Sequence, residues 1–255
     1  LAALEVQHRD RPGRAKNVLV ILEQGGMSHT DTWDPKPDTL TSQLSPYKPI
    51  STTVPGMQFT ELLPHTAKVA DKLSVIRSMH HTTGIANGHP KGTQYTLSGH
   101  VPGGPLEMPD MGSVVAHRMS SNCGYLSPYI MAPGNSEQAK ESRLGFMPYD
   151  TQVFKTGGRD LSEPGWKVPG LVLNEAIGEP RLRNRLNLLG NLDVGLPNNH
   201  SRKAQGWQKA IEQAEESLFN PNSKIAFDLE QESNKTRDTY GRGHRGQCYL
   251  LGRRL

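Results

Sequence analysis

The sequence Val18-Leu19-Val20-Ile21-Leu22, followed after two polar residues by Gly25-Gly26, decides the fold that we expect. The apolar run is short, continuous and rich in β-branched residues. Together with the paired glycines behind it, this predicts a strand over residues 17–22 that is buried on both faces. The glycines allow a positive φ or a close approach of the backbone to a ligand, with N–H groups presented to an anion.

Similar short apolar segments recur along the chain. Leu73-Ser74-Val75-Ile76 predicts a second strand and Tyr129-Ile130-Met131 a third. Helical spacing of apolar residues predicts helices at 60–72, 89–97 and 111–119. Alternation of strands and helices indicates an α/β fold with a mostly parallel sheet and helices on its faces.

The rest of the chain predicts less regular structure and then helices. Residues 135–200 are rich in Gly, Pro and Asn, and we expect a loop-rich insertion or cap there. Helices are expected at 202–219, 223–240 and 246–255, the last with Leu250, Leu251 and Leu255 at helical spacing. We interpret 1–255 as a single truncated domain, incomplete at the C-terminus, with an exposed lead-in over 1–15.

Composition excludes some classes of function. A chain of 255 residues can bury a sizeable core, and 34% hydrophobic residues make it a polar protein. No run approaches the roughly 18 apolar residues of a transmembrane segment. The net charge of +4 is spread along the chain without a dense basic block. We therefore exclude nucleic acid as the main partner, while anionic substrates remain open.

The candidate site lies where the first two strands end. Ligands in open α/β sheets bind beyond the carboxyl ends of the strands, so both following loops are expected at one edge. Imidazole and carboxylate groups bind Zn, Mn or Fe(II) and serve as general acids and bases. The first loop supplies Glu23, Ser28, His29, Asp31 and Asp34, and the second supplies His80, His81, Asn87, His89 and Lys91.

Structural explanations stay open beside these functional ones. Residues 28–34 are also typical of a turn in which Ser and Asp side chains bond their own backbone, with Trp33 packed beneath. His80 and His81 can simply be polar residues at a strand exit. The basic segment 241–246 can grip an anion or merely begin a helix, and the second explanation is favoured.

Several landmarks in order along the chain resemble one protein family. The sequence is similar to domain-of-unknown-function family 1501, which is grouped with the alkaline phosphatase and sulfatase superfamily. The landmarks are residues 16–22, 25–36, 77–80, 95–99 and 111–115, and the ending from Tyr240-Gly241 to Arg253-Arg254-Leu255.

The resemblance implies both a fold and a location. It implies an alkaline-phosphatase-like three-layer α/β/α sandwich that continues beyond Leu255. It also implies an exported bacterial protein, periplasmic or extracellular, often carrying a twin-arginine signal. The site implied is one for a divalent metal, Zn, Mn, Fe or Ca.

Carrying the superfamily's site onto this sequence gives unusual residues. Counting ten residues back from Gly99 places His89 where a Cys or Ser nucleophile is usual. The paired acidic metal ligands after the first strand correspond to Glu23-Gln24, of which only Glu23 is a ligand type. Either His29 and Asp31 have taken over ligation, with Asp34 beside them, or the metal site is altered or lost.

Two hypotheses about function follow. The first is an exported metal-dependent hydrolase of phosphate or sulfate esters, with a sulfated glycan among its candidate substrates. In it His89 acts at the nucleophile position, Glu23, His29, Asp31 and Asp34 bind metal, and Ser28, His80, His81 and Lys91 bind substrate. The second is a non-catalytic relative that keeps the fold and holds a glycan or anion at the same edge.

Overall fold

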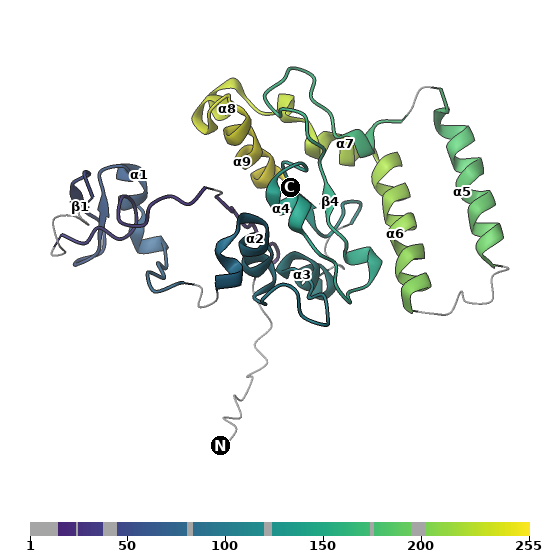
Figure 1. Cartoon of the computed structure of the whole chain (residues 1–255). Helices are drawn as coiled ribbons and strands as arrows, with labels where there is room; N and C mark the ends of the chain where they lie inside the picture. Colours follow the sequence, from purple (N-terminus) through teal and green to yellow (C-terminus); the bar gives the residue numbers. More distant parts are fainter. Residues whose placement is uncertain are drawn as a thin grey trace. The chain divides into compact units, whose positions relative to one another are not determined.

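A computed structural model of the chain describes residues 15–23, 25–37, 45–80, 84–119, 124–173, 176–194 and 202–255 (Figure 1). The chain separates into two compact units. The small unit is Val20–Thr82, and the large unit comprises Leu1–Leu19 and Thr83–Leu255. We describe each unit by itself.

The small unit is built around a β-hairpin. Strands β1 (Pro49–Ser51) and β2 (Gln58–Thr60) are antiparallel, with Ile50 opposite Phe59. Gly56 in the connecting turn has φ +79°, a left-handed conformation that glycine adopts without strain. The helices that follow are short: α1 spans Pro64–Ala67, and the 3₁₀ turn η2 spans Ala70–Lys72.

A small apolar core holds this unit together. Phe59 and Ala70 are fully buried and Ala67 is nearly so. Trp33 packs edge-on against Phe59, with ring centroids 5.2 Å apart and an interplanar angle of 76°. The segment that precedes the hairpin is therefore fixed to β2 by an aromatic contact.

The large unit is mainly helical and contains a single pair of bridged strands among its described residues. Strand β3 (Ile130–Met131) pairs in parallel with β4 (Phe154–Lys155). The other elements are η3 (Gly84–Asn87), α2 (His89–Ser98), α3 (Met111–Met119), α4 (Glu137–Glu141), η5 (Tyr149–Thr151), η6 (Pro169–Leu171), α5 (Gly178–Val194), α6 (Arg202–Phe219), α7 (Pro221–Phe227), η7 (Leu229–Gln231), α8 (Asn234–Tyr240) and α9 (His244–Arg254).

The core of the large unit joins the region after β4 to the C-terminal helices. Its buried side chains come from the loop and turn region before α5 and from α7, η7 and α9. These side chains are Leu161, Val168, Leu171, Phe227, Leu229, Leu250 and Leu251. Residues 135–200, for which we expected a loop-rich insertion or cap, thus contribute directly to the core.

The same region also contains a long helix that the sequence did not indicate. Within residues 178–192 of α5, whose side chains are described, none is fully buried, and only a stripe that includes Leu182 and Leu186 is half-buried. Its apolar periodicity is therefore weak, which explains why loops were expected. The guanidinium of Arg183 lies 3.8 Å from the ring centroid of Phe219, so α5 contacts α6 through a cation–π interaction.

Several predicted helices are confirmed. Helices α3 and α6 have the expected bounds, and α2 extends the expected 89–97 by one residue. Gly99 ends α2 in the left-handed conformation, φ +70°, and its N–H donates to the Tyr95 carbonyl. Asp110 caps α3, since its Oδ1 accepts the N–H of Ser113 at 3.1 Å.

The helix expected over 60–72 is divided. Its first residue, Thr60, is of a type that favours the N-cap position and was expected there. Instead, Thr60 ends β2 and its hydroxyl donates to the Asp31 carbonyl. Pro64 begins α1 instead, at a position where its missing N–H costs no helical bond.

The first two predicted strands are absent from the described structure. Residues 17–22 form no ladder, and Val18, Leu19, Val20 and Ile21 are each more than half exposed rather than buried. Residues 73–76 are likewise without strand pairing. A strand requires neighbours, and the described sheets are two separate two-stranded pairs. The sandwich thus stays a prediction, and the described structure is a mixed fold of many helices and small sheets.

No helix of the described residues is both long and apolar enough to span a membrane.

Candidate functional site

A compact turn opens the candidate site in the small unit. The carbonyl of His29 accepts the N–H of Asp34 at 2.8 Å and the N–H of Thr32 at 3.3 Å. The Thr32 hydroxyl donates to the Ser28 carbonyl at 2.8 Å. Residues 28–34 therefore form a turn held by backbone hydrogen bonds and by the Thr32 hydroxyl, rather than by Ser and Asp side chains bonded to their own backbone as the structural explanation had it.

The turn is fastened to the hairpin. The N–H of Thr60 donates to the Thr32 carbonyl at 2.9 Å, and the hydroxyl of Ser45 donates to Asp31 Oδ1 at 2.6 Å. Together with the contact between Trp33 and Phe59, these bonds hold the turn in place. Gly25 and Gly26 just before it have φ values of +87° and +55°, so the positive φ expected there is confirmed.

Asp34 is the electrostatic centre of the site. Its side chain is only 13% exposed, and its oxygens lie 3.3 Å from Lys36 Nζ, 3.6 Å from Arg77 Nε and 3.7 Å from His29 Nδ1. A carboxylate so removed from water requires such partners, because an unpaired buried charge is costly. One anion thus gathers three basic side chains.

Arg77 connects the carboxylate to the hairpin. Its Nη2 donates to the Gln58 carbonyl at 2.9 Å, while Nε faces Asp34. Its Nη1 has no partner among the described residues, and the side chain is 37% exposed. The guanidinium is therefore held on one side by protein and has donors available on the other.

Asp34, Arg77 and His29 line one pocket with a volume of about 620 Å³. Lys36 contacts Asp34 but is not among the residues that line the pocket. His80 contributes a second imidazole, whose Nδ1 lies 2.9 Å from the Ser78 carbonyl. Because a carbonyl only accepts, Nδ1 carries the hydrogen and Nε2 is left to bind a ligand. The pocket is lined by His29, Trp33, Asp34, Leu73, Ser74, Val75, Ile76, Arg77, Ser78, Met79 and His80.

The balance of charge suits an anion. Arg77 and Lys36 are two permanent cations that share one carboxylate, so the site keeps a net positive charge even with both imidazoles neutral. The Arg77 fork can bind two oxygens of a phosphoryl or sulfuryl group. Protonation of the imidazoles adds positive charge and donors.

The structure brings only some of the predicted site residues together. His29, Asp34 and His80 line the same pocket, as expected for the two loops. Ser28 and Asp31 help to form the turn, and half-buried Glu23 precedes it, but none of the three lines the pocket. His81 lies outside the described residues.

Two predicted residues belong to the large unit. His89 is the first residue of α2 and Lys91 lies in its first turn, and both side chains are exposed. The role of His89 as a nucleophile remains a prediction.

The described residues do not fit a divalent metal. No group of three or more His, Cys, Asp or Glu side chains in the described part of the chain is arranged to hold one. The two predicted acidic ligands of the turn are already engaged, Asp34 by basic side chains and Asp31 by the Ser45 hydroxyl. We therefore derive no step through a metal.

Sequence reasoning missed the two residues that give the pocket its charge, Arg77 and Lys36. Both were quoted only as family landmarks. The sequence did contain a signal, because each loop carries a basic residue close to its predicted site residues. Lys36 lies two residues after Asp34, and Arg77 directly follows the apolar segment 73–76. Carboxylates and imidazoles are the usual metal ligands, whereas Lys and Arg side chains are not, so a metal-site hypothesis does not include these two residues.

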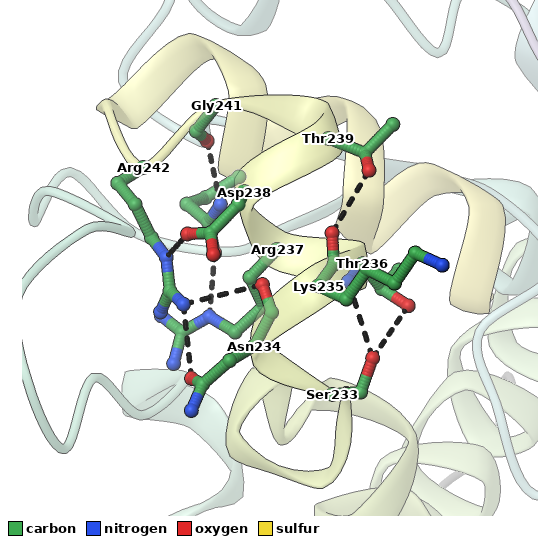
Figure 2. A network of polar contacts seen from close by, with 10 residues as sticks. Ser233, Asn234, Lys235, Thr236, Arg237, Asp238, Thr239, Gly241 and Arg242 are labelled. Carbon is green, nitrogen blue, oxygen red and sulfur yellow. Dashed lines mark hydrogen bonds and ion pairs between the residues drawn. The ribbon is translucent and has the colours of Figure 1, made fainter.

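The basic segment 241–246 has the structural role that was favoured for it. Figure 2 shows Arg242 beside α8, bonded to two of its side chains. Its Nε lies 2.5 Å from Asp238 Oδ1 and its Nη2 2.9 Å from Asn234 Oδ1. Gly246 also packs very closely here, since a Cβ on it would lie 2.1 Å from the Tyr240 carbonyl oxygen. These contacts join α8 to α9.

A Cys, His and Asp cluster in the large unit lacks the features of a nucleophilic site. His244 Nδ1 accepts the N–H of Leu161 at 3.0 Å, and its Nε2 lies 3.9 Å from Cys248 Sγ. Burial, with a smaller contribution from the Asp160 charge, raises the pKa of the Cys248 thiol to about 11. The cysteine thus stays a protonated thiol near neutral pH.

A second pocket, of about 210 Å³, lies in the large unit beside buried Asp110. Asp110 Oδ2 accepts the hydroxyls of Tyr129 and Ser142. Burial and the Asp110 charge raise the pKa of Tyr129 well above its ordinary value. Since Asp110 is fully bonded and also caps α3, we assign it a structural role.

Comparison with known proteins gives one family. The model of the family described as "Protein of unknown function (DUF1501)" matches residues 15–255. No curated protein and no solved structure matches the chain.

Proposed function

We propose that this chain, which belongs to the DUF1501 family of proteins of unknown function, binds a phosphate or sulfate ester in the pocket around Arg77. The observation that carries the proposal is the pairing of one shielded carboxylate, Asp34, with the cations Lys36 and Arg77. The surplus positive charge at a preformed pocket favours an anionic ligand.

Each residue has a separate task in this binding site. Asp34 orients Arg77 through its ion pair with Nε, and the Gln58 carbonyl fixes the guanidinium plane by accepting a hydrogen bond from Nη2. Arg77 then donates to two ester oxygens, as planar guanidinium groups do in phosphate recognition. Imidazoles of His29 and His80 supply further donors when they are protonated.

Hydrolysis of the bound ester, assistance by a divalent metal, and export from a bacterial cell are implied by the sequence resemblance and remain predictions. The binding proposal does not depend on them, because the described residues include no group of side chains arranged to bind a metal ion.

Calorimetric titration with methyl phosphate and methyl sulfate, in the presence of a chelator, tests the binding proposal. Changing Arg77 to Gln should weaken binding at least about tenfold, since charge-assisted hydrogen bonds contribute about 1.5–3 kcal/mol. Arg77→Lys keeps the charge without the fork and should give an intermediate affinity.

The matched control removes a positive charge elsewhere in the small unit. Lys68 is exposed and does not line the pocket, so Lys68→Gln should leave the affinity unchanged. Equal binding by wild type and by a folded Arg77→Gln variant would refute the site. Binding of these esters that depends on added divalent metal would favour the metal-dependent account instead.

A further inference from the structure

The pocket around Arg77 has an apolar wall beside its charged end. Leu73, Val75, Ile76 and Met79 follow one another along the segment that also carries Arg77. Ile76 is 68% exposed and Met79 76% exposed, so these side chains present carbon surface rather than filling the core. Large apolar side chains left open in a pocket are typical of ligand contact.

Two side chains of this apolar wall, Ile76 and Met79, are distinct from the core of the small unit, whereas Val75 packs against that core. Phe59, Ala67 and Ala70 form that core, and Ile76 and Met79 are not part of it. Their exposure therefore has no packing explanation within the described small unit. Leu62, exposed at 47%, offers a comparison because it lies outside the pocket.

The polar groups of the pocket are concentrated at its charged end. Asp34 is engaged by cations, and the Ser78 carbonyl is engaged by His80. Besides the two imidazoles and the indole N–H of Trp33, the uncharged polar side chains lining the pocket are two serines, Ser74 and Ser78. Recognition of a sugar ring requires several positioned donors and acceptors for its hydroxyls, whereas an aryl or alkyl group requires only carbon surface.

We propose, resting on the function proposed above, that the ligand is a monoester of an apolar alcohol, with an aryl or alkyl group on the Ile76 and Met79 wall and the anionic group at Arg77. The pocket volume of about 620 Å³ lies within the range of sites for small organic ligands, so it has room for both parts. Charge complementarity sets the orientation, because Arg77 and Lys36 mark the end that receives the anion.

Calorimetry with three phosphate monoesters separates the ligand classes. Phenyl phosphate, methyl phosphate and glucose 6-phosphate carry the same anionic group on different alcohols. Burying most of a phenyl ring should tighten binding at least about tenfold relative to methyl phosphate. Glucose 6-phosphate should bind no more tightly than methyl phosphate.

Substitutions then locate the effect on the wall. Ile76→Ser and Met79→Ser change exposed side chains and should reduce the preference for phenyl phosphate over methyl phosphate to about twofold or less. Leu62→Ser removes an exposed apolar side chain outside the pocket and should preserve the preference.

The outcomes distinguish this inference from the function on which it rests. If neither the three phosphate monoesters nor methyl sulfate binds, both are refuted. If phenyl and methyl phosphate bind equally and Arg77→Gln weakens both, the anion site stands and the apolar ligand class is refuted. Tighter binding of glucose 6-phosphate than phenyl phosphate would overturn the inference in favour of a glycan ester. A phenyl preference that survives both serine substitutions would also overturn it.

Discussion

Replacing Asp34 with Asn should strengthen ester binding, in contrast to what a metal site would show. The carboxylate is 3.3 Å from Lys36 Nζ and 3.6 Å from Arg77 Nε. An anion hydrogen-bonded to the outer side of these cations would therefore lie about 6–7 Å from the carboxylate, given ordinary hydrogen-bond lengths. At this distance the two negative charges repel one another, and Asn removes that repulsion while keeping the size and one acceptor oxygen.

The magnitude follows from Coulomb's law. With an effective dielectric constant of about 40, between the value for surface pairs and that of water, the repulsion is about 1.3 kcal/mol per ligand charge. The dissociation constant for a monoanionic ester should accordingly fall about tenfold in Asp34→Asn. Raising the ionic strength should reduce this gain, because the surrounding cations are partly exposed.

Calorimetric titration with methyl sulfate in chelator measures the effect directly. Glu61→Gln, which removes a carboxylate at an exposed position outside the pocket, serves as the matched control and should change the affinity less than twofold. Far-ultraviolet circular dichroism establishes that each variant is folded. Unchanged or weaker binding by folded Asp34→Asn would refute the reasoning, and a loss of tightly bound metal would replace it with the metal account.

The remaining predictions concern stability. Changing Asp110 to Ala should lower the free energy of unfolding by about 2–4 kcal/mol in urea titration, because three donors lose their buried acceptor; a loss below 0.5 kcal/mol would contradict its structural role. Gly246→Ala should lower the free energy of unfolding, because a Cβ there would lie 2.1 Å from the Tyr240 carbonyl oxygen in the contact between α8 and α9. Gly190→Ala in α5 serves as the comparison, because a Cβ there meets nothing within 4 Å. This second variant should raise the free energy of unfolding by up to about 1 kcal/mol. Equal effects of the two substitutions on the thermal midpoint would refute the close packing of Gly246 against the Tyr240 carbonyl. The raised pKa of Cys248 means that the unfolded chain ionises first, so stability should be constant below pH 9 and fall as the pH rises from 9 towards 11. After allowance for partial exposure the fall is about 1 kcal/mol, and a Cys248→Ser variant with the same fall would contradict its origin.

Local signals in the sequence predicted much of the helical structure. Gly99 stops α2 and Asp110 caps α3, and both act through the few residues next to them. Leu250 and Leu251 were recognised by their helical spacing, and both are fully buried. Such features depend on neighbours in sequence, which is why they could be inferred without the fold.

Features that depend on distant partners were harder to predict. The apolar run Val18–Ile21 has the composition of a central strand, yet strand formation depends on a neighbour that the sequence does not specify. Likewise, Thr60 is a good helix cap by type, but its bonds to the turn around Thr32 place it in β2. Tertiary contacts thus override local preference at both positions.

The residues of the candidate site were only partly predicted, because the site also depends on contacts between residues distant in sequence. His29, Asp34 and His80 were expected to lie together because both loops follow apolar segments. The three residues line one pocket, although those segments do not pair as strands. The identity of the partners decides the chemistry, however. Only the ion pairs of Asp34 with Lys36 and Arg77 distinguish an anion site from the metal site that the resemblance implied.

Mapping of backbone amide chemical shifts during titration with phenyl phosphonate, in the presence of a chelator, tests the central claim most directly. We predict saturable shifts concentrated in residues 28–36 and 73–80, which line or support the pocket of the small unit. Shifts confined to the large unit, or shifts that arise only when a divalent metal is added, would contradict the proposal of an anion site around Arg77.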